Sequence, residues 1–211
     1  MLRAVIAEDN KYMQKYLSDL LVEEGDFEIA ALFEDAFEAE KYCLGDSVDL
    51  ALMDIHTVHG HSGLSAGERI RKSGKKTKVI LVTSLVDPDI LIRAKTGAAD
   101  SLWYKDHGEE DLINVIRRTL AGEHIFPERS PNVELKEMFS HEISPRQMLV
   151  LRRFVQGYTY DQIASELKMT ANGVRWNLDQ IIAKGGFENK HELLAAVLSN
   201  KLVVDAILKS E

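Results

Sequence analysis

The first 120 residues alternate between two kinds of pattern, and this alternation leaves few possible folds. Stretches with helical spacing separate five short apolar or β-branched runs, which are Leu2–Ala7, Phe27–Leu32, Leu50–Met53, Val79–Thr83 and Ser101–Tyr104. Alternating strand and helix patterns predict βα units around a parallel sheet. The runs are apolar throughout, which is typical of strands that are covered on both faces. The sequence therefore predicts an α/β domain with a doubly wound, five-stranded parallel sheet.

The rest of the chain divides into a linker and a small all-α domain. Residues 123–140 carry two prolines and no clean period, so we predict a linker there. Ser144 and Pro145 are typical of a helix start, and Gly157 of a helix end. Four helices are expected, over about residues 145–156, 160–167, 171–184 and 191–204. We therefore predict one domain over residues 1–122 and a second over residues 141–211.

Charge is distributed unevenly between these two parts. Residues 1–140 hold 17 Lys+Arg and 26 Asp+Glu, a net charge of −9, whereas residues 141–211 hold 9 and 8, a net charge of +1. This asymmetry indicates different roles for the two parts. The second part is only faintly basic, although a basic surface is the usual mark of a nucleic-acid binder.

Cysteine content and hydropathy indicate where the protein works. The single cysteine, Cys43, excludes an internal disulfide and fits a reducing compartment. No apolar run reaches the roughly 18 residues of a membrane-spanning helix. The first residues, MLRAVIAED, turn acidic too early for a secretory signal. We therefore expect a cytoplasmic protein without a membrane partner.

Polar side chains stand at the ends of four predicted strands. Glu8 and Asp9 follow the first strand, Asp54 follows the third, Thr83 ends the fourth and Lys105 follows the fifth. Ligands of doubly wound sheets bind at the carboxyl ends of the strands, so we expect these groups to converge. Taken singly, Glu8 and Asp9 could belong to a helix cap, and Asp54 to a turn.

Together these groups suit phosphoryl chemistry. Three carboxylates repel one another unless a cation joins them, and Mg²⁺ takes oxygen ligands of this kind. With such an ion present, Asp54 could attack a phosphoryl group as a nucleophile. Thr83 and Lys105 could then hold the phosphoryl oxygens. The conjunction of all five groups favours this chemistry over a purely structural role.

Four motifs of this half, VIAEDN, DLALMDI, VILVTS and WYKD, resemble the receiver domain of bacterial two-component response regulators. The resemblance covers about residues 1–122 and implies a flavodoxin-like fold. It implies that Asp54 is the phosphoacceptor, Thr83 the switch hydroxyl and Lys105 the conserved lysine of the site. It also implies a magnesium site made by Glu8, Asp9, Asp54 and the backbone carbonyl of His56.

The chain departs from the receiver pattern at two places. The loop DIHTVHGHSGL lacks the proline that usually follows the phosphoacceptor. Leu102 stands three residues before Lys105, where the family usually has its aromatic switch residue, and Trp103 and Tyr104 follow it. The phosphoryl site is therefore expected to be whole, and it is open whether Trp103 takes over the usual aromatic role.

Two other chemistries compete at the same loop. A haloacid-dehalogenase-type phosphatase has a D-x-D pair at such a strand end, but His56 stands two residues after Asp54. Without that acid we expect no enzyme beyond slow autophosphorylation and autodephosphorylation. Zinc binding by His56, His59 and His61 fits no standard spacing, so we expect solvated loop histidines.

The second half has a helix-turn-helix pattern in YDQIASELKMTANGVRWNLDQIIAK. Helical spacing puts Val174, Leu178 and Ile181 on one face of the third helix, with Arg175 and Trp176 on the other. The stretch SPRQMLVLRRFVQGYTYDQIASELKMTANGVRWNLDQIIAKGGF resembles the LuxR/NarL-type output domain. That resemblance implies that the third helix enters the major groove of DNA. The predicted DNA contacts are Tyr160, Val174, Arg175, Trp176 and Lys184.

Both resemblances together imply a two-component response regulator. A sensor histidine kinase would phosphorylate Asp54, and the chain would then bind double-stranded promoter DNA as a homodimer. The output domain departs from its family at Gly173, Asn177 and Asp179. Because of these departures and the faint charge, a protein-binding or phosphorylation-independent regulator on the same scaffold is the alternative.

Overall fold

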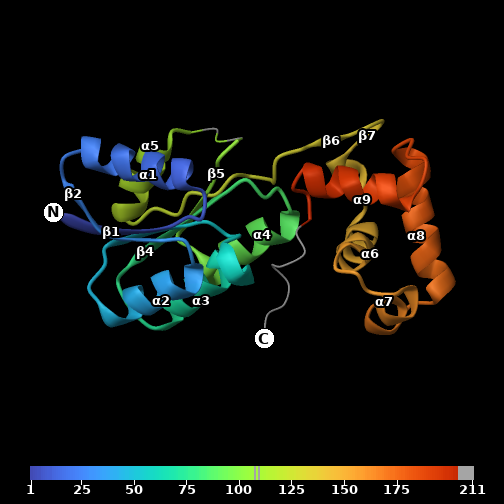
Figure 1. Cartoon of the computed structure of the whole chain (residues 1–211), viewed down its shortest axis with the longest axis horizontal. Coiled ribbons are helices and arrows are strands. Elements are labelled where there is room, and N and C mark those ends of the chain that lie inside the picture. The colour runs from blue at the N-terminus through green and yellow to red at the C-terminus, as the bar shows by residue number, and fades with distance from the viewer. Residues whose placement is uncertain (107, 109, 204–211) are drawn as a thin grey trace. The chain divides into compact units, whose positions relative to one another are not determined.

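The computed structural model describes residues 1–106, 108 and 110–203 of the chain. These residues form two compact units (Figure 1). Among the described residues, the α/β unit contains residues 1–84 and 88–130, and the helical unit contains residues 85–87 and 131–203. Within this part of the chain, no helix combines the length and hydropathy that crossing a membrane requires.

Five parallel strands form the sheet of the α/β unit. They are β1 (Leu2–Ala7), β2 (Phe27–Phe33), β3 (Leu50–Met53), β4 (Lys78–Thr83) and β5 (Ser101–Tyr104). Their order in the sheet is β2-β1-β3-β4-β5, and every neighbouring pair is parallel. This arrangement confirms the predicted doubly wound five-stranded sheet. Because β1 and β3 are adjacent and strand order reverses there, the groups that follow these strands meet at one edge.

Helices cover both faces of this sheet. The helices are α1 (Lys11–Glu23), α2 (Ala36–Gly45), α3 (Gly63–Lys72), α4 (Pro88–Arg93) and α5 (Leu112–Leu120). Figure 1 shows α1 and α5 on one face, with α2 and α3 on the other. On the first face, Leu17, Leu21 and Ile116 pack against Ile6 and Leu52 of the central strands. All four residues of β3 are buried, as a strand covered on both faces requires.

The helical unit contains α6 (Pro145–Val155), α7 (Tyr160–Glu166), α8 (Ala171–Lys184) and α9 (Lys190–Ser199). Ser144 caps α6: its hydroxyl accepts from the N–H of Gln147, whose side chain accepts from the N–H of Ser144. Thr170 caps α8 in the same manner, because its Oγ1 accepts from the N–H of Gly173 at 3.0 Å. The predicted small all-α domain is therefore present. The predicted end of its last helix, Val204, lies outside the described residues, and α9 ends at Ser199.

The predicted linker contains secondary structure. A short antiparallel hairpin, β6 (Glu134–Leu135) and β7 (Met138–Phe139), lies in this segment. Leu135 and Met138 are buried in the core of the helical unit, so residues 131–140 belong to that unit. Two-residue strands leave no periodic pattern in a sequence, which is why this hairpin was not predicted.

Candidate functional site

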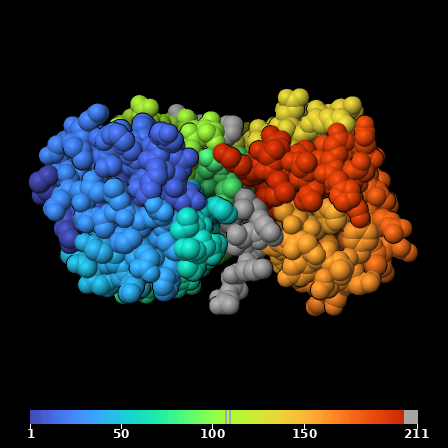
Figure 2. All heavy atoms as spheres, in the orientation of Figure 1, coloured from blue at the N-terminus to red at the C-terminus, as the bar shows by residue number. Residues whose placement is uncertain are grey.

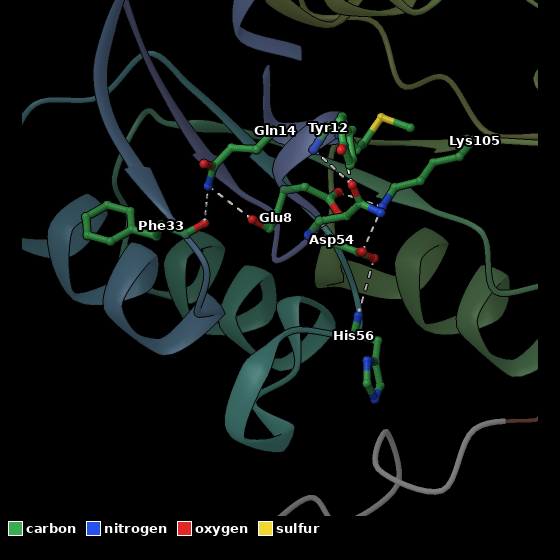
Figure 3. Close-up of polar contacts among 9 residues, drawn as sticks. Glu8, Tyr12, Gln14, Phe33, Asp54, His56 and Lys105 are labelled. Atoms are coloured by element: carbon green, nitrogen blue, oxygen red, sulfur yellow. Dashed lines mark hydrogen bonds and ion pairs between the residues drawn. The ribbon is translucent and has the colours of Figure 1, made fainter. Parts of the chain in front are cut away.

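Residues 8–10, which follow β1, supply both the cap of α1 and two carboxylates of the candidate site. Asn10 caps α1, because its Oδ1 accepts from the N–H groups of Tyr12 and Met13 at 3.0 and 3.2 Å. The capping alternative therefore applies to Asn10 and leaves the carboxylates of Glu8 and Asp9 available. Glu8 itself is held in place by Gln14, whose amide donates to the backbone carbonyl of Glu8 at 3.0 Å (Figure 3).

Lys105 bonds to two of the predicted site carboxylates. Its Nζ donates to Oε2 of Glu8 at 2.5 Å and to Oδ2 of Asp54 at 2.7 Å, as Figure 3 shows. The three side chains are 8, 1 and 11% exposed, respectively, so these ion pairs are almost completely shielded from water. The topology thus brings groups from the ends of β1, β3 and β5 into direct contact.

Asp9 completes an acidic cluster beside this pair. Oxygen atoms of Glu8, Asp9 and Asp54 lie within 4.8 Å of one another, and within the described ranges this is the group whose geometry could hold a metal ion. Its donors are oxygens alone, which suits a hard cation. No histidine belongs to it. His56 has an exposed side chain, and its N–H donates to Oδ1 of Asp54 at 3.3 Å.

Burial and charge shift the protonation of this cluster. Burial raises the pKa of Asp54, and the ammonium of Lys105 opposes that rise only in part. Burial and the neighbouring Asp54 likewise raise the pKa of Glu8. For Lys105, burial lowers the pKa, but Asp54 and Glu8 together outweigh it and raise the pKa above its ordinary value. Lys105 therefore stays an ammonium, and the carboxylates lack a full set of counter-charges.

The backbone around Asp54 and Lys105 is closely packed. Gly63, the first residue of α3, approaches so near that a Cβ there would lie 2.0 Å from the carbonyl oxygen of Asp54. Sequence analysis missed this residue, because an approach between two elements leaves no mark in a single sequence. Thr83 is fully buried at the end of β4, and its carbonyl accepts from the N–H of Lys105 at 2.8 Å.

On the helical unit, the structure places the predicted DNA contacts on different sides of their helices. Arg175 and Trp176 are exposed on α8, Trp176 to 60%. Val174 is 0% exposed and belongs to the apolar core, so its prediction as a DNA contact was wrong. The helical period, which put Val174 on the inner face, was the better guide. Lys184 is exposed, with its Nζ 3.2 Å from Oε1 of Glu142.

Tyr160 begins α7 and is half-buried. Its ring packs near the ring of Phe154, with 6.3 Å between the centroids, and the ammonium of Lys190 lies 5.9 Å from its centroid. The structure thus places Tyr160 at the rim of the core, partly buried.

A comparison with protein families identifies the α/β unit. The model of the response regulator receiver domain matches residues 4–117, more than half of the chain. The chain belongs to this family. The relatives described next confirm the predicted resemblance to response regulators of the LuxR/NarL type.

Two proteins of Staphylococcus aureus and one of Salmonella are similar to this response regulator. The oxygen regulatory protein NreC of S. aureus is 26% identical, over 96% of this chain and 99% of NreC. A structure titled as a DNA-binding response regulator of the LuxR family from S. aureus is 28% identical over 57% of this chain and 99% of that one, with a TM-score of 0.53. RcsB from Salmonella enterica serovar Typhimurium, solved with a promoter and a phosphomimetic, is 19% identical over 94% of this chain and 98% of its own, with a TM-score of 0.61. At that identity the likeness to RcsB shows the fold.

This receiver holds one histidine of its β3–α3 loop in a defined place. Nδ1 of His61 lies 2.8 Å from both carboxylate oxygens of Asp35. The hydroxyl of Thr57 donates to the carbonyl of His61 at 2.7 Å and accepts from the N–H of Ala36 at 3.0 Å. His61 is exposed, as predicted for a solvated loop histidine, and it also ties the loop to the start of α2.

The receiver also replaces the usual aromatic of β5 by a different arrangement. Leu102 and Tyr104 are buried, and Trp103 is partly buried. Nε1 of Trp103 donates to the carbonyl of Glu110 at 2.8 Å. A Cβ at Gly108 would lie 2.5 Å from Nε1 of the same indole, so Gly108 lies close to this ring. Trp103 of β5 thus contacts both Gly108 and Glu110.

Proposed function

We propose that this chain is a phosphorylation-gated, DNA-binding transcription regulator whose phosphoacceptor is Asp54. The observation that carries the proposal is the buried bridge from Lys105 to Glu8 and Asp54 at the carboxyl edge of the sheet. A lysine in this place favours the ionised form of Asp54 and can bind an incoming anion. The phosphodonor would be a sensor histidine kinase, as membership of the receiver family suggests.

The phosphoryl transfer needs few groups. An Oδ of Asp54 attacks phosphorus, while the bond from phosphorus to the donor's histidine nitrogen breaks and its electron pair stays on that nitrogen. Lys105 then moves its hydrogen bond from the carboxylate to a phosphoryl oxygen. The Thr83 hydroxyl is proposed to bind a second phosphoryl oxygen, which would draw the end of β4 toward Asp54.

The acidic cluster fits Mg²⁺. Oxygen atoms of its three carboxylates lie within 4.8 Å of one another. When ionised, these carboxylates carry more negative charge than the single ammonium of Lys105 can balance. We propose that Glu8, Asp9 and Asp54 hold the ion, together with the backbone carbonyl of His56 and water. When bound, Mg²⁺ would neutralise charge that repels the phosphoryl group.

Turnover of phosphate esters is not part of this proposal. The side chain two residues after Asp54 is an exposed imidazole, His56, where a haloacid-dehalogenase-type phosphatase carries its second aspartate. We propose only slow, Mg²⁺-dependent autophosphorylation from small donors, and slow autodephosphorylation by water.

The output would be DNA binding by a homodimer. The 14-residue α8 presents exposed Arg175 and Trp176 after a tight turn from α7, as a recognition helix does. Tyr160 and Lys184 are proposed as flanking contacts to phosphates. Two copies would place two α8 helices about one turn of DNA apart, on paired half-sites. A structure of two RcsB dimers bound to two DNAs has this same fold.

Intact mass tests the proposal. The wild-type chain and Asp54→Asn are incubated with Mg²⁺ and a small phosphodonor such as acetyl phosphate. We expect one added phosphoryl group on the wild type and none on the variant. Added mass on Asp54→Asn would contradict Asp54 as phosphoacceptor. So would a folded wild-type chain that gains no mass and, in a parallel assay, releases no inorganic phosphate from the donor.

The faint charge of the helical unit favours a second candidate, a regulator that binds protein through the same helices. Residues 141–211 carry a net charge of only +1, and Asp179 lies among the exposed residues of α8. Gel-shift assays at low salt with genomic fragments distinguish the two. Binding that increases on phosphorylation supports the DNA-binding regulator. No binding in either state favours the protein-binding one.

A further inference from the structure

The outer side of α8 is a continuous stripe of exposed or partly exposed side chains. α8 lies at the outer surface of its own unit, in orange-red in Figures 1 and 2. Its inner side is buried through Val174, Leu178 and Ile181. The exposed residues recur at spacings of three and one along the helix, at Asn172, Arg175, Trp176, Asp179, Gln180, Ala183 and Lys184. Such spacing puts all of them on one face, which is the face that a ligand of this helix would meet.

Apart from Lys184, the polar side chains of this stripe have no partner within the part of the chain that the structure describes. Neither Arg175 nor Asp179 forms a hydrogen bond or an ion pair there, although they stand four residues apart. Several other ions of the helical unit are paired, as in Arg153–Glu166, Lys136–Glu192 and Lys184–Glu142. The hydrogen-bonding capacity of the stripe is therefore available to a partner.

The unpaired charges of the stripe cancel, because Lys184 is paired with Glu142 and the remaining charges are one cation, Arg175, and one carboxylate, Asp179. Affinity for nucleic acid that rests on phosphates needs an excess of cations. A recognition helix without excess positive charge must derive more of its affinity for DNA from contacts with the base edges than from contacts with phosphates. Asp179 then matters most, since a carboxylate near phosphates is repelled unless DNA donates hydrogen bonds to it.

The major groove offers two such donors, the N6 amino group of adenine and the N4 amino group of cytosine. Adenine presents its N7 acceptor beside N6, and that lone pair repels the second oxygen of a carboxylate. Cytosine has no acceptor on its own major-groove edge. A carboxylate is therefore matched to cytosine, and the arginine one turn earlier is matched to guanine, whose O6 and N7 accept two hydrogen bonds.

We propose that Asp179 is a specificity-determining residue that reads a cytosine through its N4 amino group, with Arg175 reading a guanine close to it. This inference rests on the proposed DNA-binding function. Four residues of α-helix rise about 6 Å, and base pairs are about 3.4 Å apart. The two side chains therefore reach bases within about two base-pair steps, and each half-site should contain a guanine and a cytosine at that separation.

Selection from a random pool of duplex DNA tests this assignment. The full-length chain is phosphorylated with Mg²⁺ and a small phosphodonor, and the sites bound by the wild type and by Asp179→Asn are sequenced. Glu188→Gln is the control, because it removes the same charge from an exposed residue outside the stripe. A charge effect on phosphate affinity is common to both variants, whereas a change in base preference is expected of Asp179→Asn alone.

We expect the wild type to prefer cytosine at one position of each half-site by roughly tenfold, the discrimination of one good base contact. Asp179→Asn should lose that preference and keep the others, and Glu188→Gln should keep all of them. Identical base preferences in the wild type and Asp179→Asn, or a change at a position that is not cytosine, would overturn the inference and leave DNA binding intact. No enriched sequence with the wild type would overturn the DNA-binding function as well.

Discussion

The phosphoacceptor site and the outer stripe of α8 differ in whether their charged side chains form hydrogen bonds and ion pairs within the protein. Lys105 is buried and bonded to Glu8 and Asp54. Arg175 and Asp179, among the described residues, are exposed and without a partner. The first set of contacts forms within the protein itself, whereas the polar groups of the second can form contacts only with a ligand.

This difference predicts where substitutions act. Groups bonded to one another in a buried site contribute to the free energy of unfolding, and a ligand must rearrange them when it enters. Groups on an exposed and unpaired stripe contribute almost nothing to folding and act through affinity. The four predictions below separate these two effects, in order of decreasing size.

Lys105→Met should have the largest effect on folding. It leaves Glu8 and Asp54 as buried charges without their counter-ion, and breaking a buried ion pair in this way costs about 3–5 kcal/mol of unfolding free energy. Urea unfolding of the full chain, followed by circular dichroism, measures it. Mg²⁺ should restore more stability to the variant than to the wild type, because it supplies the missing positive charge.

Lys15→Met is the matched control for this prediction. Lys15 pairs with Asp19 at 2.6 Å on the exposed side of α1, where an ion pair contributes less than about 1 kcal/mol. Equal losses in the two variants would mean that the bridge of Lys105 adds no more than a surface pair.

Gly63→Ala should cost about 3 kcal/mol, the upper part of the range for overpacking. The new Cβ would lie 2.0 Å from the carbonyl oxygen of Asp54 and 2.9 Å from its carbonyl carbon, so the backbone of α3 or of the phosphoacceptor must move. We expect slower phosphorylation together with a lower melting temperature. Gly45→Ala, at a position with nothing within 4 Å of the added Cβ, should leave both unchanged. A melting temperature of Gly63→Ala equal to that of the wild type would show that α3 can move away from Asp54 without loss of stability.

Val174→Ala and Trp176→Ala, two residues apart on α8, should separate stability from affinity. Val174 is fully buried, so its truncation should lower the unfolding free energy of the helical unit by about 2 kcal/mol. Trp176 is 60% exposed, so its loss should change stability by less than about 0.5 kcal/mol and lower DNA affinity roughly tenfold. Denaturation and titration of a selected DNA site measure the two. The contrast fails if Val174→Ala weakens DNA binding without loss of stability.

Much of the fold could be predicted from the sequence because the strands are buried on both faces. Such strands are continuous apolar runs, and the predicted bounds of Leu2–Ala7, Leu50–Met53 and Ser101–Tyr104 agree with the structure residue for residue. The helix cap at Ser144 was also predicted, because a cap depends on neighbours in the chain.

The contacts that complete the phosphoacceptor site could not be predicted in the same way. Gln14 reaches the carbonyls of Glu8 and Phe33, and Gly63 makes room for Asp54, through approaches between separate elements. Strand-end positions could place Glu8, Asp54 and Lys105 at one edge. They could not reveal that Lys105 bridges the two carboxylates, since that depends on side-chain conformation.

His61→Asn should have the smallest effect, and it should depend on pH. Burial alone would raise the pKa of Asp35, but the hydrogen bonds from His61 and from the N–H of Phe37 outweigh it and hold the pKa below its ordinary value of 3.8. A carboxylate whose pKa is lowered on folding stabilises the protein above its ordinary pKa, and this stabilisation is lost as pH falls through the lowered value.

Removing the imidazole should raise the pKa of Asp35, so the variant should lose stability at a higher pH than the wild type. At neutral pH the loss should be about 1 kcal/mol or less, because His61 is half-exposed and water screens the pair. Melting temperatures measured from neutral pH down to about pH 3 test this, with His56→Asn in the same loop as control. If the two variants follow the same curve, His61 does not stabilise Asp35. If only the melting temperature of His61→Asn departs from that of the wild type in acid, His61 and Asp35 form a second polar pair that is satisfied within the receiver. The Arg175 and Asp179 side chains of the α8 stripe form no such internal pair.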